Sequence, residues 1–355
     1  MSELQRFTPQ DRVLVIAPHP DDEAIATSGV LQVAHAAGAA CRVLVITDGD
    51  NNPWPQRWIE KRWHIGADAR ARWGAGRRAE AMAALRVLGL HADDVRCFGF
   101  PDLGLTDLLM NADIGLETAL AGQLDEFRPT CLFLPALDDR HPDHSALHVL
   151  LRLALRKRGG PTPQLYTFGV HGETAAADDV VLTLSESQRE IKRAAIMSHT
   201  TQMRLSRRRF VAYARAIEPF RMAATPGVAD PQHPVQATVR ADGTMQVRID
   251  HARWGRGMRG QMLFGVVQYA QGETRRWRVM LSGGGLADVL DTVARGSAGP
   301  ARVARSAGET DISLTIGSAA ACWIKLARPQ PGLFVLDRCG WQTAAISDTR
   351  SWERN

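Results

Sequence analysis

Short apolar runs alternate with amphipathic stretches from the start of this 355-residue chain to about residue 220. The apolar runs have the length of β-strands, and the stretches between them have the spacing of helices with one apolar face. This alternation predicts an α/β fold, a mainly parallel sheet with helices on both faces. The expected strands are Arg12–Ala17, Cys41–Thr47, Val95–Phe100, Thr130–Ala136 and Leu165–Val170, and the expected helices are Glu23–Ala37, Arg77–Leu88, Ile114–Glu126, Ser145–Arg158 and Glu186–His199.

The order of these strands decides where a ligand would bind. In the common Rossmann-like order 3-2-1-4-5, the first and fourth strands are neighbours, and the order reverses between them. Ligands of such sheets bind in the crevice outside the carboxyl ends of the strands at this reversal. We therefore expect functional side chains to follow the first and fourth strands.

Histidine and carboxylate residues do follow both strands. The stretch from His19 through Asp21 and Asp22 to Glu23 comes after the first, and a second cluster of His141, Pro142, Asp143 and His144 comes after the fourth. His19 and Asp22 are three residues apart across a strand-to-helix turn, so both can face one metal ion. Zinc in hydrolases usually takes three protein ligands, and a further, uncoordinated carboxylate can take a proton from water. A merely acidic first helical turn would explain the first cluster alone but not both.

The C-terminal third of the sequence differs from the rest in composition and in hydrophobic pattern. Residues 223–235 are rich in Pro, Gly and Ala and are predicted to be a linker between a domain at 1–222 and a β-rich domain at 236–355. Hairpin-like strand pairs predict a small antiparallel sandwich in this second domain. The expected strands are Gln236–Arg240, Met245–Ile249, Leu263–Tyr269, Trp277–Leu281, Ile312–Ile316 and Cys322–Leu326. This domain would serve packing or oligomerisation, or contact a glycan or a partner.

Composition limits the cellular setting. The polar first ten residues have no signal-peptide pattern, and no apolar run reaches the length of a membrane span, so we expect a cytoplasmic protein. The five scattered cysteines are expected to be reduced thiols. The net charge is +5, but only four of the 43 basic residues are lysine and the arginines are spread along the chain, which argues against a nucleic-acid partner.

Several motifs together resemble a known family. The two clusters, the turn from Thr47 to Gly49, the segment from Arg77 to Glu80, the run from Gly99 to Asp102 and the stretch from Lys192 to Gln202 occur in order and spacing as in the PIG-L/LmbE-like family of zinc-dependent N-acetylglucosaminyl deacetylases. The similarity extends over roughly residues 10–222.

This resemblance implies a role for each residue of the two clusters. It implies that His19, Asp22 and His144 bind zinc or another divalent metal and that Asp21 is the general base. It further implies that His141 stabilises the oxyanion or protonates the leaving amine. Asp143 would orient one of the imidazoles. Some relatives carry a tyrosine where this chain has Asp139, so a tyrosine contribution to the oxyanion is not expected here.

The substrate contacts are less constrained. The resemblance suggests that Arg78 and Asp102 touch the sugar, although an exposed helix ion pair and a loop acid are the alternatives. A loop expected over residues 51–76 carries four tryptophans; Trp58 and Trp63 would stack on a sugar conjugate or simply anchor the loop. A basic run, Arg204 with Arg207 to Arg209, would attract an anionic group or form a solvated helix end.

These observations predict a metal-dependent hydrolase that removes the N-acetyl or N-acyl group from an N-acetylglucosamine-type conjugate. The alternatives are another metal-dependent amidase and a non-catalytic carbohydrate-binding protein. An Fe(II) oxygenase would also use two histidines and a carboxylate, but usually as a His-x-Asp pair in a β-barrel. The identity of the conjugate, the acyl length and the oligomeric state stay open.

Overall fold

The computed structural model describes residues 2–158, 160–172, 180–223, 233–254, 260–328 and 335–347. The chain divides into two compact units. The first unit comprises Met1–Leu105, Thr118–Asp139 and Arg158–Ala223, and the second comprises Thr106–Glu117, Arg140–Lys157 and Ala224–Asn355.

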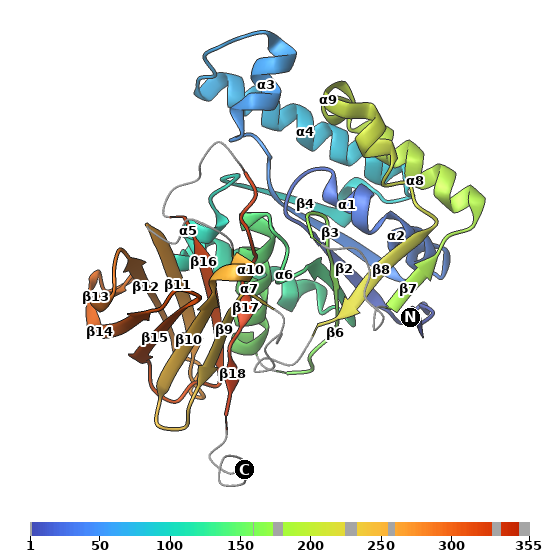
Figure 1. The fold of residues 1–355 in the computed structure, drawn as a ribbon. Helices are drawn as coiled ribbons and strands as arrows, with labels where there is room; N and C mark the ends of the chain where they lie inside the picture. The colour runs from blue at the N-terminus through green and yellow to red at the C-terminus, as the bar shows by residue number, and fades with distance from the viewer. Residues whose placement is uncertain are drawn as a thin grey trace. The chain divides into compact units, whose positions relative to one another are not determined.

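The first unit is built on an eight-stranded sheet (Figure 1) with the strand order β1-β7-β8-β6-β5-β2-β3-β4. Its strands are β1 (Ser2–Glu3), β2 (Arg12–Ala17), β3 (Ala40–Thr47), β4 (Val95–Phe100), β5 (Cys131–Pro135), β6 (Gln164–Phe168), β7 (Val180–Thr183) and β8 (Ile217–Met222). The run β6-β5-β2-β3-β4 is parallel throughout, so the predicted order of the five expected strands is confirmed. The three other strands were not predicted; β8 pairs antiparallel with β6 and β7, and β1 pairs parallel with β7.

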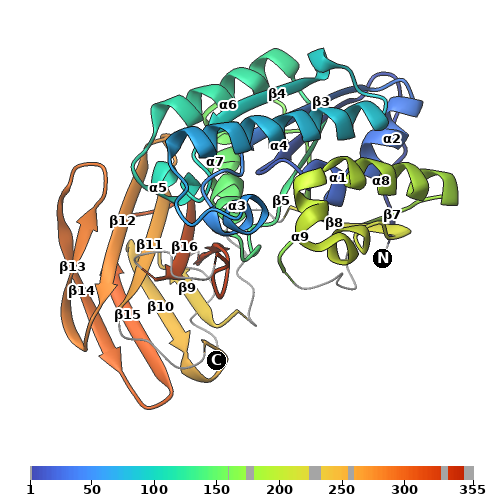
Figure 2. The same cartoon turned by 90° about the horizontal axis from the view of Figure 1, so that it is seen from above.

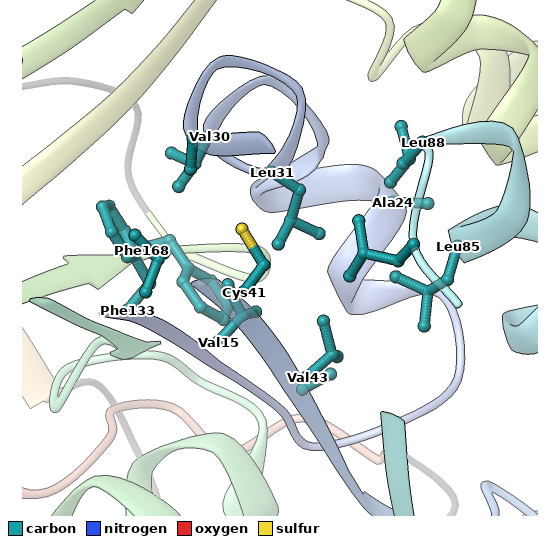
Figure 3. Packing of buried hydrophobic residues seen from close by; sticks show 14 of the residues in the cluster. Val15, Ala24, Val30, Leu31, Cys41, Val43, Leu85, Leu88, Phe133 and Phe168 are labelled. Atoms are coloured by element: carbon teal, nitrogen blue, oxygen red, sulfur yellow. The ribbon is translucent and has the colours of Figure 1, made fainter. Parts of the chain in front are cut away.

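The central strands are apolar along nearly their whole length because both faces of the sheet are covered. All five residues of β5, and five of the six in β2, are buried. Figure 3 shows Val15 and Val43 of the sheet packed beneath Ala24 and Leu31 of the covering helices. Strands buried on two faces have continuous rather than alternating hydrophobicity, which is why these runs were recognisable in the sequence.

The helices are α1 (Asp22–Ala26), α2 (Ser28–Ala36), α3 (Pro53–Glu60), α4 (Ala67–Val87), α5 (Leu105–Met110), α6 (Ile114–Phe127), α7 (Pro142–Arg158), α8 (Glu186–Ser198), α9 (Thr200–Val211) and α10 (His251–Trp254), with a 3-10 turn at Ala92–Asp94. In the first unit α4 packs against α8, and both contact α1. The predicted capping box at the start of α8 is confirmed, since the Ser185 hydroxyl accepts from the Gln188 amide and the Gln188 side chain accepts from the Ser185 amide.

The prediction of one helix over Glu23–Ala37 is wrong, because the helix breaks at Thr27. The cause is Glu218, whose carboxylate accepts hydrogen bonds from the amides of Gly29 and Val30 at the start of α2. A carboxylate that satisfies these amides provides the new helix with an N-terminal cap. Glu218 belongs to β8, about 190 residues later in the sequence. The break between α1 and α2 could therefore not be predicted from the residues around Thr27.

The prediction of a loop over residues 51–76 is also wrong. Asn52 caps α3 by accepting a hydrogen bond from the Trp54 amide, Pro53 occupies the first helical position, and α4 begins at Ala67, ten residues before the predicted start of its helix. Proline at this position is typical of a helix start. Charged and small residues are spread around most of the circumference of α4, so its sequence lacks the apolar stripe by which the helix would have been predicted.

The second unit is built on a ten-stranded sheet with the order β17-β16-β11-β12-β13-β14-β15-β10-β9-β18. Its strands are β9 (Val235–Val239), β10 (Thr244–Asp250), β11 (Gln261–Gln268), β12 (Thr274–Leu281), β13 (Gly285–Asp291), β14 (Gly296–Arg305), β15 (Glu309–Thr315), β16 (Ala321–Ala327), β17 (Gln342–Thr343) and β18 (Ala345–Ile346). The predicted hairpins of β9 with β10 and of β11 with β12 are confirmed. The third predicted pair, Ile312–Ile316 with Cys322–Leu326, is wrong, because β15 pairs with β10 and β14, while β16 pairs with β11 and β17.

The hairpin of β13 and β14, visible in Figure 2, was not predicted, because its Gly, Ala and Ser residues lack apolar alternation. The strands of this unit enclose one apolar cluster. Most of the predicted linker, residues 224–232, lies outside the described residues.

None of the helices among the described residues is long and apolar enough to cross a membrane. All five cysteines are free thiols; Cys41, Cys131 and Cys322 are buried.

The buried ion pair between Lys192 and Glu218 is expected to contribute to the free energy of unfolding. Their side chains are 2 and 1% exposed, with Nζ and Oε1 2.6 Å apart. The change Lys192→Met leaves a buried carboxylate without its cation, and we expect a loss of roughly 3–5 kcal/mol in the free energy of unfolding. Chemical denaturation measures it. The pair of the exposed Arg72 and the partly exposed Glu60 provides the control, because Arg72→Met should cost less than about 1 kcal/mol. Equal losses in the two variants would contradict this account.

Candidate metal and catalytic site

The first cluster lies at the carboxyl end of β2. The chain leaves the strand at Ala17, and α1 begins at Asp22, with Asp21 as its N-cap residue. Asp21 has φ 130°, a backbone conformation that L-residues other than glycine rarely adopt, and its side chain makes no capping hydrogen bond. Such strain costs of order 1–3 kcal/mol and persists only where the surroundings enforce it. The Asp21 carboxylate is therefore held away from the helix terminus by other contacts.

His19 lies between two carboxylates. Its Nδ1 is 3.3 Å from Asp22 Oδ2, and its Nε2 is 3.1 Å from Asp102 Oδ1. The His19 amide also donates to Asp22 Oδ2 at 3.0 Å, which fixes the turn. All three residues are buried. A metal-binding histidine donates from one ring nitrogen to a carboxylate and coordinates the metal through the other, so the contact of Nε2 with Asp102 makes Nδ1, on the side of Asp22, the candidate ligand atom.

The Asp21 carboxylate is held by Arg77 of α4. The guanidinium of Arg77 donates to Asp21 Oδ2 at 3.0 Å, to the carbonyl of Pro20 at 2.5 Å and to the carbonyl of Gly49 at 2.9 Å. Gly49 has φ 60°, and a Cβ atom there would lie 1.6 Å from Arg77 Nη1. A glycine is thus required at this turn both for its conformation and to leave room for the guanidinium.

Burial and charge act differently on Asp21 and Asp102. Burial raises the pKa of Asp21 to about 6; the Arg77 guanidinium opposes this shift, and the neighbouring Asp22 carboxylate adds to it. Burial alone would also raise the pKa of Asp102. The hydrogen bond and charge of His19, together with Arg77 and the Asn51 amide, outweigh burial and lower the pKa of Asp102 below its usual value. Asp102 is therefore held as an anion facing His19.

The second cluster lies at the start of α7, in the second unit. His141 directly precedes the helix, and His144 lies in its first turn; both are buried, and their ring centroids are 5.0 Å apart. The Asp143 amide donates to His141 Nδ1 at 3.3 Å. A nitrogen that accepts from an amide carries no proton, so a neutral His141 carries its proton on Nε2. His141 is thus prepared to donate a hydrogen bond from Nε2.

The donors of the two clusters fit a zinc ion by their chemistry. Neutral imidazoles and carboxylates are the ligands that zinc takes in hydrolases, and His19, Asp22 and His144 are all buried. His19 and Asp22 belong to the first unit, and His144 belongs to the second. Within the first unit, Asp102 supplies the carboxylate that orients His19.

Of the residues predicted to contact substrate, Asp102 is 4% exposed, and its second oxygen accepts from the Asn51 amide. Arg78 is half-buried and forms an ion pair with Asp48. Trp58 and Trp63 are 77 and 79% exposed, so they do not anchor residues 51–76 against the sheet.

Three features of the site were not assigned from the sequence. They are the Arg77 contact to Asp21, the 2.8 Å contact between His199 Nε2 and Glu23 Oε1, and the Glu80 carboxylate, which accepts from Thr200 and Thr201. All of these residues lie in motifs noted in the sequence, and the motif order was the signal for them. The first pairing joins α4 to the N-cap residue of α1, and the other two join α1 and α4 to the junction of α8 and α9, so none could be inferred from local spacing.

A cavity of about 700 Å³ lies within the first unit, a volume that suits a drug-sized ligand. Its apolar lining includes Phe168, Tyr213 and Phe220, and Arg209 and Arg215 also line it. Arg209 belongs to the basic run predicted above, which α9 exposes to solvent. At Asp139, where some relatives carry a tyrosine, the carboxylate accepts from the amides of Val170 and His171.

Comparisons with known proteins agree with these motifs. Residues 14–155 match the model of the family described as PIG-L, GlcNAc-PI de-N-acetylase. The chain is 29% identical over 170 residues to a 1D-myo-inositol 2-acetamido-2-deoxy-alpha-D-glucopyranoside deacetylase of Mycolicibacterium gilvum, a match that covers 44% of this chain and 58% of the relative. It is 27% identical over 190 residues to the 2'-N-acetylparomamine deacetylase of Streptomyces fradiae, covering 50% of this chain and 63% of the relative.

The chain thus spans about three fifths of the length of these two relatives. Among solved structures, it resembles the N,N'-diacetylchitobiose deacetylase of Pyrococcus horikoshii with 19% identity and a TM-score of 0.48, covering 60% of this chain and 84% of that one.

The buried pair of His199 and Glu23 makes stability depend on pH. Burial alone would lower the pKa of His199, but the Glu23 carboxylate, its hydrogen bond and Asp21 together raise it above the ordinary value. A raised pKa in the folded state adds stability that is complete below the unfolded pKa and is lost as pH rises through the folded pKa.

We therefore expect the difference in melting temperature between the native protein and His199→Gln to be largest near pH 6 and to shrink towards pH 9. A series of thermal melts measures it. His64 is exposed, so His64→Gln should leave the melting temperature unchanged at every pH. A His199→Gln difference that stays constant with pH would mean that the pair is not ionic.

Proposed function

Because residues 14–155 belong to the PIG-L/LmbE-like family of deacetylases, we propose that this protein hydrolyses the N-acetyl group of an N-acetylglucosamine-type sugar conjugate. The observation that carries this proposal is the strained and buried Asp21, which Arg77 holds one residue from a metal-ligand candidate. In this proposal 1–222 is the deacetylase domain on a Rossmann-like sheet, 223–235 is the linker, and 236–355 is a sandwich-like accessory domain. We propose a cytoplasmic location and no nucleic-acid partner.

We propose that His19, Asp22 and His144 bind one divalent ion, with zinc expected. Strands β2 and β5 are parallel neighbours, so their carboxyl ends lie side by side. His19 follows β2 by two residues and His141 follows β5 by six, which supports a common site at this edge. A zinc ion bound there would polarise the amide carbonyl and lower the pKa of a water molecule to near 7.

The other residues of the site handle protons and orientation. Asp102 accepts from His19 Nε2 and would fix this imidazole with Nδ1 towards Asp22. Asp21 would take the proton of the attacking water, and Arg77 would keep its carboxylate in place. His141 would donate from Nε2 to the developing oxyanion or to the leaving amine. Asp143 contributes the amide that sets the tautomer of His141.

The sugar and its conjugate would use residues outside this centre. We propose Arg78 as a sugar contact and the exposed Trp58 and Trp63 as stacking surfaces. A sugar contact by Asp102 would compete with its hydrogen bonds to His19 and Asn51. The cavity with Arg209 and Arg215 suits an apolar, acidic part of the conjugate.

A direct test incubates the zinc-loaded protein with free, nucleotide-linked, lipid-linked and peptide-linked N-acetylglucosamine compounds and measures released acetate. Acetate from one class would identify the conjugate. Binding without acetate release would favour the carbohydrate-binding alternative, and release from amides without a sugar would favour another amidase.

The ligand set predicts how metal binding responds to substitution. His19→Ala and His144→Ala should each lose most of the bound metal, because each removes one of three protein ligands. Elemental analysis after dialysis measures the metal content. His35, a histidine of α2 outside both clusters, provides the control, since His35→Ala should keep full occupancy. Full occupancy in both ligand variants would refute the assignment.

The general-base role predicts a separation of metal binding from turnover. Asp21→Asn keeps the shape of the side chain but removes the proton acceptor, so metal should remain while kcat falls by roughly 10²–10⁴-fold. Asp22→Asn is the matched comparison, because the neighbouring carboxamide should weaken metal binding as well. Acetate release and metal content are measured on the same samples. Near-normal turnover of Asp21→Asn would show that another group accepts the proton.

A further inference from the structure

The helix that carries the second cluster is bound to the C-terminal sheet by polar contacts within the second unit. The Arg140 carbonyl accepts from the Asp337 amide at 2.9 Å, and Arg140 Nε donates to the Asp337 carbonyl at 3.1 Å. Residue 140 directly precedes His141. The backbone at Asp337 therefore fixes the point where the chain enters the cluster.

A buried lysine extends this contact to the far side of the cluster. Lys325 of β16 is 2% exposed; its Nζ lies 2.7 Å from Asp337 Oδ2 and donates to Ser145 Oγ at 3.4 Å. Ser145 follows His144 directly, and both its amide and its hydroxyl donate to the carbonyl of His141 at 3.2 Å. The chain from 140 to 145 is thus held at both ends by residues of the C-terminal third.

Burying the ammonium group of Lys325 costs free energy of folding. An ammonium group in the interior loses its hydration, and one carboxylate that is itself 24% exposed returns only part of that free energy. An apolar side chain would pack at this position of β16 without the loss, as Trp323 and Ala327 do on the same face of the strand. The ammonium group donates a directed hydrogen bond to Ser145, which an apolar residue could not do.

We propose that Lys325 and Asp337 are positioning residues for His141 and His144, so that the C-terminal domain completes the catalytic site instead of serving as an independent module. This inference rests on the proposed function. Lys325 fixes Ser145, Ser145 fixes the carbonyl of His141, and the turn sets the direction of both imidazoles. Neither Lys325 nor Asp337 needs to touch the substrate.

The test compares variants of the full-length chain. Lys325→Met removes the hydrogen bond to Ser145, and Lys325→Arg retains a cation and donors. Ile312→Ala is the control: it lowers stability by leaving a cavity in the apolar cluster of the same sheet, and Ile312 belongs to that cluster. Three readouts are measured: zinc affinity by competition with a chelator, the imidazole NMR signals of His141 and His144, and kcat and KM for acetate release.

We expect Lys325→Met to weaken zinc binding by roughly 10–100-fold, as is typical when a residue behind a metal ligand is removed. It should also shift both imidazole signals and lower kcat more than it raises KM, while Lys325→Arg restores most of each. Ile312→Ala should melt earlier with the three readouts unchanged.

Native zinc affinity and imidazole signals in Lys325→Met, or the same losses in Ile312→Ala, would overturn the proposal and leave Lys325 a structural residue. The NMR and zinc readouts do not depend on turnover. If the native protein binds zinc but releases no acetate, the proposed activity fails while these readouts still decide the role of Lys325.

Discussion

Consecutive buried carboxylates at the start of α1 are the constraint on which the rest of the first unit depends. Asp21, Asp22 and Glu23 are all buried, and burial of uncompensated anions would be prohibitive. Each carboxylate therefore faces a basic group: Arg77 of α4, His19 of the same turn, and His199 at the junction of α8 and α9. These pairs, in addition to apolar packing, tie α4 and the end of α8 to α1.

The same principle explains why α1 and α2 are separate helices. Glu218 is buried, pairs with Lys192, and accepts from the first amides of α2. One carboxylate thus compensates a buried lysine and a helix terminus together. A continuous helix would have no free amides at this point, and Glu218 would keep only its lysine. The break limits α1 to Asp22–Ala26, a short helix whose first turn is held by Arg77 and His199 from other elements.

Prediction from the sequence succeeded where the cause is local. Apolar runs predicted the positions of the parallel strands, and the common 3-2-1-4-5 arrangement supplied their order. Ser185 and Gln188 predicted the start of α8, and the turn at Asp242 and Gly243 predicted the hairpin of β9 and β10. It failed where the cause is a distant side chain, as at Thr27, or where the pattern is weak, as in α4 and in β13 with β14. For the site, the chemistry of His19 and Asp22 was visible, but the assignment of Arg77 to Asp21 required the turn at Gly49.

The boundary of the functional domain differs between sequence and structure for a physical reason. The similarity to the family extends to about residue 222, yet residues 106–117 and 140–157 form a compact unit with the C-terminal sheet. Polar contacts hold them there: Arg276 pairs with Glu117, Thr292 donates to the Met110 carbonyl, and Lys325 reaches Ser145. Removing the sheet would remove these three contacts and the constraints that they place on residues 106–117 and 140–157. The histidines of the second cluster therefore depend for their orientation on residues far outside the motif that contains them.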